Sequence, residues 1–275
     1  MNTLRLKTIF TLLGATMGLT VTSQALAVDG VILIDQARAM AGGVTTDDAP
    51  GFPVTIGTSG SYRLASNLNL GIGGGNTTAI EIRSPAGSAL NVTLDLNGFM
   101  ISGHPYCDFN GQSDNTCFPS GTGVGIRVEN GASVTISNGG IRGMGLHGIF
   151  CLGACKVDGM TIANNGGSGM AASGPGAASF TLTRSTVLLN RTGISGSRGL
   201  VQSNVLEFNL GNAIEANNSA LLNNLISGNG GLGLAGTGNG YGANVFTFNN
   251  GGDGLPQVSA GNIQTATNVC GAGPC

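Results

Sequence analysis

The sequence predicts an all-β protein, a right-handed single-stranded parallel β-helix (a solenoid) with a short capping helix near its N-terminus. Three observations support this fold class. Fifty of the 275 residues are Gly and 27 are Asn, and both residue types tolerate the positive φ angles of tight turns. Aliphatic residues recur after Gly or Ala every 20–24 residues in the second half of the chain. Hydrophobic residues make up 41% of the chain, which argues against disorder.

The repeat is marked by seven steps from a small residue to a larger apolar one. Consecutive marker residues are 23, 21, 24, 20, 20 and 21 positions apart. A unit of this length holds two or three short strands, as one coil of a parallel β-helix does, whereas a βαβ unit needs about 30 residues. Helical solenoids have longer units, and Gly would destabilise their helices by about 1 kcal/mol each. The markers are Ile126, Ile149, Met170, Ile194, Ile214, Leu234 and Leu255.

Each unit also ends a second strand-like segment with Asn. Stacked coils would place these side-chain amides about 4.8 Å apart, where each can donate a hydrogen bond to the next. The sequence therefore predicts an inward-facing Asn ladder, although Asn is also a good turn residue and the pattern fits both interpretations. The ladder residues are Asn164 (or its neighbour Asn165), Asn190, Asn209, Asn229 and Asn249.

The segments around the regular repeats complete the expected domain organisation. Residues 1–27 are interpreted as a removable export signal, because Arg5 and Lys7 precede an apolar run that ends at a small-residue cleavage site. Residues 28–61 form a cap region, in which 34–40 is expected to be a short helix that covers the open end of the solenoid. The β-helix domain is expected over 62–260, with a loop insertion at 104–120 and a C-terminal tail over 261–275.

Charge and export limit the partners. Without residues 1–27 the chain has nine basic and 13 acidic residues, a formal charge of −4, which argues against a nucleic-acid partner. No later stretch is apolar enough to span a membrane. The mature chain is therefore expected to be secreted or periplasmic, and nothing in it calls for a cofactor.

Six Cys residues in an exported chain indicate disulfide bonds. Six Cys allow 15 pairings, and proximity in sequence favours Cys107–Cys117, Cys151–Cys155 and Cys270–Cys275. The second pair requires a turn, because an extended strand would hold its Cα atoms about 13 Å apart. A zinc site that uses His104, Cys107 and Cys117 is a weaker alternative, since there is no paired Cys-x-x-Cys motif, and no metal is expected.

The repeats from about Tyr62 to Asp253 resemble the pectin-lyase-like right-handed β-helix superfamily, especially Leu94-Asp95-Leu96-Asn97-Gly98 followed by Ile101-Ser102-Gly103. The resemblance implies the fold but not an activity, because that superfamily includes lyases, hydrolases, epimerases, adhesins and members without known chemistry. The Asn-Thr-Asp, Asp-Asp, Gly-His-Gly and Arg-Ile-Lys segments of its polygalacturonase branch are absent from the repeat. Leu146-His147-Gly148 and Ile141-Arg142 match them only in part.

Strand alternation places the first and third residues after each marker on the outer face. The candidate ligand-binding residues found in this way are Arg127, Glu129 and Glu215. Four coils, about 19 Å, separate Arg127 from Glu215, so these two cannot form one catalytic pair. The simpler interpretation of Arg127 and Glu129 is a salt bridge worth less than about 1 kcal/mol. Sugar sites usually also offer an aromatic platform, for which Phe150 and Tyr241 are the candidates.

No catalytic residue is assigned. His147 and His104 have no carboxylate beside them in the sequence, and the acids of the repeat are scattered. We therefore expect a non-enzymatic exported protein that binds a polysaccharide or a cell-surface glycan. The alternatives are a polysaccharide lyase or glycoside hydrolase of unrecognised type and a structural or adhesive surface protein. A lyase would need a basic residue, and the candidates are Arg127, Arg142, Arg184, Arg191 and Arg198.

Overall fold

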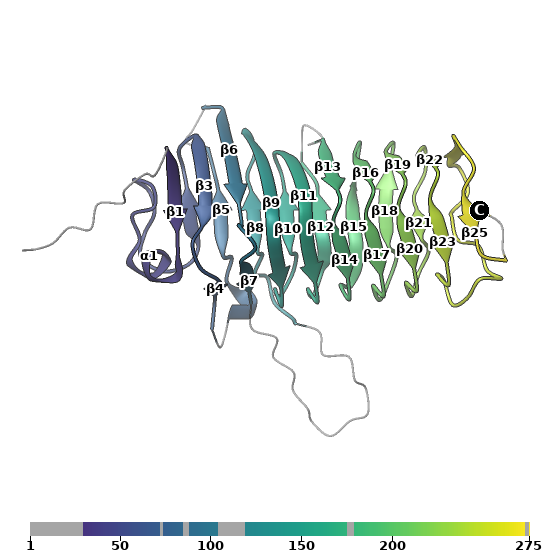
Figure 1. The fold of residues 1–275 in the computed structure, drawn as a ribbon, viewed down its shortest axis with the longest axis horizontal. Coiled ribbons are helices and arrows are strands. Elements are labelled where there is room, and N and C mark those ends of the chain that lie inside the picture. Colours follow the sequence, from purple (N-terminus) through teal and green to yellow (C-terminus); the bar gives the residue numbers. More distant parts are fainter. Residues whose placement is uncertain (1–29, 72–73, 85–87, 104–118, 175–178, 273–274) are drawn as a thin grey trace, which may run out of the picture.

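The computed structural model describes residues 30–71, 74–84, 88–103, 119–174, 179–272 and 275 (Figure 1). These residues form a parallel β-solenoid whose coils stack side by side along the long axis, from the purple N-terminal end to the yellow C-terminal end (Figure 1). This confirms the predicted all-β solenoid with one short helix. The predicted export signal at 1–27 and the Cys107–Cys117 pair, with His104, lie outside the described residues.

The strands belong to two sheets, and all their pairings are parallel. The eight-stranded sheet contains β2 (Val54–Ile56), β5 (Ile80–Ile82), β8 (Ile126–Val128), β10 (Ile149–Cys151), β12 (Ser168–Ala172), β15 (Thr192–Ser197), β18 (Ile214–Asn217) and β21 (Leu234–Ala235).

The 17-stranded sheet wraps the rest of each coil. In its N-terminal half it contains β1 (Val31–Ile34), β3 (Gly60–Leu64), β4 (Leu68–Asn69), β6 (Leu90–Asp95), β7 (Met100–Ser102), β9 (Ala132–Arg142) and β11 (Ala154–Ala163). It continues with β13 (Phe180–Thr183), β14 (Thr186–Leu188), β16 (Leu200–Gln202), β17 (Val205–Glu207), β19 (Ala220–Leu222), β20 (Leu225–Ser227), β22 (Gly240–Gly242), β23 (Val245–Thr247), β24 (Ile263–Gln264) and β25 (Val269–Cys270).

The markers form one buried column along the eight-stranded sheet. Ile126 pairs with Ile149, and the register continues without a slip to Leu234. Each of these marker side chains is fully buried, and burial of one aliphatic side chain contributes about 2 kcal/mol. The column also extends upstream to Ile80 and Val54.

The prediction that Leu255 is the last residue of the buried marker column is wrong. The Leu255 side chain is 48% exposed, and Val258 instead bridges Leu234 and is buried. The cause is the turn after Asn249, in which Asn250 and Gly251 both have positive φ. This turn uses more residues than the corresponding turns of the earlier coils. The last unit is therefore longer than the 21 residues that the spacing suggested.

The coils bend at single residues with left-handed φ, and at most of these bends the next residue is a buried polar side chain. At one corner Asn190 donates from Nδ2 to Oδ1 of Asn209 over 3.1 Å, and Asn209 and Asn229 repeat this contact with the next coil over 2.8 Å. The backbone N–H of each Asn donates to the same oxygen, so the buried backbone at the bend is paired. Gln257 ends this ladder by accepting from Asn249.

The first ladder residue is Asn165 and not Asn164. Asn164 is the left-handed corner residue, with φ 52°, and it is only half-buried. The next residue along the chain then points inward, so Asn165 is fully buried and donates to Oδ1 of Asn190 over 2.8 Å.

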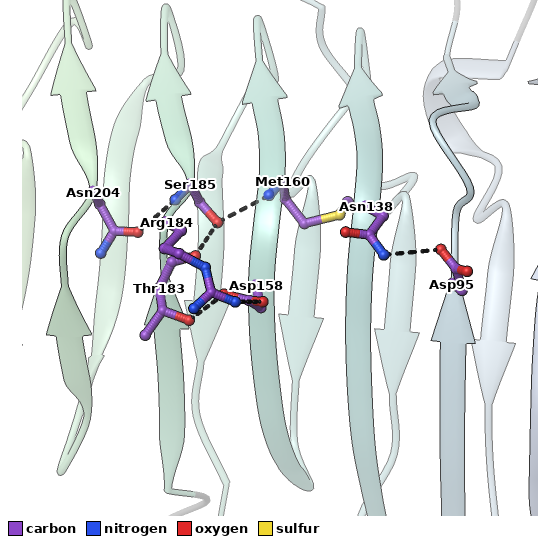
Figure 2. Close-up of polar contacts among 8 residues, drawn as sticks. All are labelled: Asp95, Asn138, Asp158, Met160, Thr183, Arg184, Ser185 and Asn204. Carbon is purple, nitrogen blue, oxygen red and sulfur yellow. Dashed lines mark hydrogen bonds and ion pairs between the residues drawn. The ribbon is translucent and has the colours of Figure 1, made fainter.

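Two further ladders occupy the other corners. Figure 2 shows the start of one, where Ser185 accepts from the backbone N–H of Met160 and donates its own N–H to Oδ1 of Asn204. That ladder continues through Asn224, Asn244 and Asn268. The third ladder consists of Ser219, Asn239 and Asn262.

The N-terminal end is covered by helix α1 (Gln36–Ala41), close to the range that the sequence predicts. Asp35 caps it by accepting from the N–H of Arg38, and Ala39 is buried against the first coil. The solenoid itself begins earlier than the expected boundary at residue 62. Strand β1 already pairs with β3, and β2 pairs with β5, because their apolar residues continue the buried columns.

Among the described residues, two local disulfides are present. Cys151 and Cys155 are joined across the tight turn between β10 and β11, with Cα atoms 6.3 Å apart, and Cys270 is joined to Cys275. In the part of the chain that the structure describes, no helix is long and apolar enough to cross a membrane.

Candidate functional site

The outer face of the eight-stranded sheet carries one column of aligned side chains. Pairing along the sheet places them in the order Glu81, Arg127, Phe150, Ala171, Ser195, Glu215 and Ala235. The column is bulky as far as Phe150 and small over the next two coils. This change of size leaves a depression on β12 and β15, between Phe150 and Glu215.

That depression is a hollow of about 620 Å³ on the outer face of β10 to β21. A second hollow, of about 790 Å³, lies at the turn that leads into these strands, and it shares Glu215 with the first. We call the two together the groove. Its polar and aromatic lining includes His147, Phe150, Ser195, Ser197, Asn212, Glu215 and Asn217 in the first hollow and Arg191 and Thr192 in the second.

The ring of Phe150 contacts two neighbouring side chains. The His147 ring lies 5.3 Å away between centroids, with a tilt of 32°. The Arg127 guanidinium lies 5.4 Å from the centroid of the Phe150 ring and forms an ion pair with Glu129. A cation–π contact at such an exposed position contributes about 0.5–1 kcal/mol. The salt bridge of the simpler interpretation is therefore present, and neither Arg127 nor Glu129 belongs to the described lining of the two hollows.

His147 lines the groove with a neutral imidazole ring. Burial lowers the pKa of its imidazole below the usual value, so the ring is neutral at pH 7. The backbone N–H of Ser168 donates to Nδ1 over 3.0 Å. Because Nδ1 is the acceptor, the ring proton lies on Nε2, which has no hydrogen-bond partner among the described residues.

Glu215 is the only carboxylate among the described residues that line the groove. Its Oε1 accepts from Nδ2 of Asn212 over 2.8 Å, and the side chain is exposed. Ser195 shares a hydrogen bond of 3.1 Å with Ser168, so its hydroxyl is also held in place. The lining thus offers hydroxyl, amide, carboxylate and N–H groups next to an aromatic ring.

The other candidates lie elsewhere. Tyr241 is not a platform, because its position on β22 faces inward, and its ring is buried edge-on against Phe246 at 6.2 Å. Arg184 forms an ion pair with Asp158 on the 17-stranded sheet, where Thr183 donates to the same carboxylate (Figure 2). Of the basic candidates, Arg191 is the one that lines the groove.

The pairing of His147 with Phe150 was not predicted from the sequence. Both residues were considered separately, and their three-residue spacing at the start of a strand was the available signal. Among the described residues, no three His, Cys, Asp or Glu side chains gather closely enough to hold a metal ion.

Comparison with known proteins bears on the fold. A family model described as a right-handed β-helix region matches residues 107–266. No curated protein matches the sequence. Among solved structures, the A-module of the Azotobacter vinelandii mannuronan C-5 epimerase AlgE4 is 13% identical, with a TM-score of 0.41 over 73% of this chain and 72% of that chain. The periplasmic alginate epimerase AlgG, as a mutant, is 14% identical, with a TM-score of 0.41 over 86% and 81%. At these values neither likeness bears on activity.

Proposed function

The chain belongs to the family of right-handed β-helix regions, and from this premise we propose that its groove binds a polysaccharide. The observation that carries the proposal is the supported ring of Phe150 beside an open hollow with a polar lining. The C–H face of a sugar ring packs on an aromatic ring, and its hydroxyls hydrogen-bond to amide, hydroxyl and carboxylate groups. The groove supplies both kinds of contact.

The shape of the groove favours a chain over a small ligand. Three coils separate Phe150 from Glu215, which corresponds to about 14 Å along the solenoid axis. Sites for small molecules usually enclose most of the ligand surface. An open depression that runs across several coils instead suits a segment of a longer polymer.

The residues of the groove favour binding without turnover. Hydrolysis of a glycosidic bond generally needs two carboxyl groups about 5–9.5 Å apart. Glu215 has no second carboxylate beside it in the described lining, and the Nδ1 atom of His147 already accepts a backbone hydrogen bond. Export through residues 1–27 would bring the mature chain to polysaccharides outside the cytoplasm, and this export is part of the proposal.

The test is binding and turnover by the purified mature chain on a panel of neutral and acidic polysaccharides. Affinity electrophoresis measures binding, while new reducing ends and the ultraviolet absorbance of unsaturated uronates measure cleavage. We expect binding without cleavage, and at least a tenfold loss of affinity in Phe150→Ala, which is about 1.4 kcal/mol. The matched control is Leu222→Ala, on the outer face of β19 in the other sheet. Absence of binding to every polysaccharide, or turnover that persists through purification, would refute the proposal.

A further inference from the structure

One corner of the solenoid carries exposed apolar side chains in a conformation that disfavours them. We call Leu189, Phe208, Gly228 and Phe248 the corner row, because backbone hydrogen bonds place them on consecutive coils. Their φ angles are 55°, 54°, 65° and 54°. Bulky residues rarely adopt this region, which favours Gly and Asn. Yet the two Phe side chains are 57% and 64% exposed, so packing in the core does not explain why Phe occupies these positions.

The absence of a side chain at Gly228 makes room for the ring of Phe208. A Cβ atom added to Gly228 would lie 2.8 Å from Cε1 of Phe208, so the ring occupies the space that a side chain at Gly228 would need. The second ring, Phe248, lies two coils from Phe208, which is about 9.6 Å. The corner therefore presents two exposed rings separated by a gap.

The corner row borders the groove. Leu210, two residues after Phe208, lines the second hollow and is itself 48% exposed. Arg191, two residues after Leu189, lines the same hollow. A polymer that lies in the groove and leaves it over the turn would therefore meet the rings next.

Charge favours a neutral polymer at this corner. The outward residues beside the row on β20 and β23 are uncharged, since Leu225 pairs with Val245 and Ser227 with Thr247, and on β17 the residue before Phe208 is the acidic Glu207. Without residues 1–27 the chain carries a formal charge of −4, and the described lining of the groove holds one carboxylate, Glu215, and one guanidinium, Arg191. Like charges across an interface oppose association, so a polyanion is disfavoured.

From these observations we propose that Phe208 and Phe248 form a second stacking platform, which extends the groove and selects neutral polysaccharides of pyranose rings with equatorial hydroxyls. Such rings expose their axial C–H groups as flat apolar faces. The inference rests on the proposed polysaccharide-binding function and adds to it the class of sugar and a second contact region.

The test compares cellohexaose, a neutral probe with equatorial hydroxyls, with hexagalacturonate, its acidic counterpart, by calorimetric titration of the mature chain. The variants are Phe208→Asn and Phe248→Asn, alone and together. Asn already occupies this left-handed position at Asn218 and Asn223 in the other corners, so the fold is preserved. Leu255→Asn removes another exposed apolar side chain, 48% exposed and outside the row, and is the matched control.

We expect the wild-type chain to prefer cellohexaose and the double variant to lose about tenfold in affinity, with Leu255→Asn unchanged. If both Phe variants bind like the wild type while Phe150→Ala loses binding, the platform is refuted and the groove stands. A preference for hexagalacturonate overturns the sugar class. A wild-type dimer that the double variant converts to a monomer, seen by light scattering, would make the row a self-association surface and overturn the platform. If no sugar binds the wild-type chain, the proposed function fails first.

Discussion

Removing one amide from the Asn ladder tests whether the ladder stabilises the coils or whether Asn only favours the turn. Asn209 is fully buried between Asn190 and Asn229. In Asn209→Ala the backbone N–H of Asn190 loses its acceptor at 3.0 Å, and an unpaired buried donor costs about 2 kcal/mol. The other lost contacts, to the Asn190 amide, the Val187 carbonyl and the Asn229 amide, raise the expected total to about 4 kcal/mol.

Equilibrium unfolding in guanidinium chloride, followed by circular dichroism, measures this loss. Asn209→Ser should lose about 2 kcal/mol, because a hydroxyl at the equivalent position, Ser185, still accepts a backbone N–H over 3.1 Å. Asn91→Ala, at an exposed strand position, should change stability by less than about 0.5 kcal/mol. If Asn209→Ala costs no more than Asn91→Ala, the ladder contributes nothing and the turn preference of Asn is the whole explanation.

Three other perturbations have defined outcomes. Phe208→Asn should raise the free energy of unfolding by about 1 kcal/mol, because Asn tolerates positive φ better; calorimetry that shows a loss instead would mean that the exposed ring packs favourably. Burial lowers the folded-state pKa of His147, so below about pH 6.5 the unfolded chain binds the proton more readily and stability falls as the pH drops. His147→Gln should flatten the decline in Tm from pH 7.5 to 5, and an unchanged slope would contradict this assignment. Removal of the Cys151–Cys155 bond by Cys→Ala substitution at both positions should cost about 2 kcal/mol in unfolding experiments, as expected for so short a loop; a loss of the whole fold would show that the bond does more than close the turn.

Much of the solenoid follows from periodicity in the sequence. The regular coils from Ile126 to Leu234 have nearly the same length, so their inward residues recur at nearly constant spacing and their column is visible without coordinates. The same reasoning fails where a turn lengthens. Leu255 keeps the spacing but lies on the surface, because the connection after Asn249 uses extra residues.

The candidate site was less predictable. The alternation of inward and outward residues correctly placed Arg127, Phe150 and Glu215 in one outer column. Which side of a strand a residue occupies depends only on the two-residue period of the strand. Whether such a column is flat or hollow depends on the sizes of side chains from four separate coils. The roles of its members also depend on contacts across coils, and these assign Arg127 to the support of Phe150.

The sequence by itself therefore determined the coil length, the inward and outward faces of the regular strands, and the local disulfides at Cys151 and Cys270, because these depend on residues near one another in the chain. The tertiary structure decided which corner each Asn occupies, that Tyr241 is buried, and that His147 and Phe150 meet beside a hollow. The physical reason is stacking: a coil contacts its neighbours about 20 residues away, and small differences in turn length decide which side chains meet.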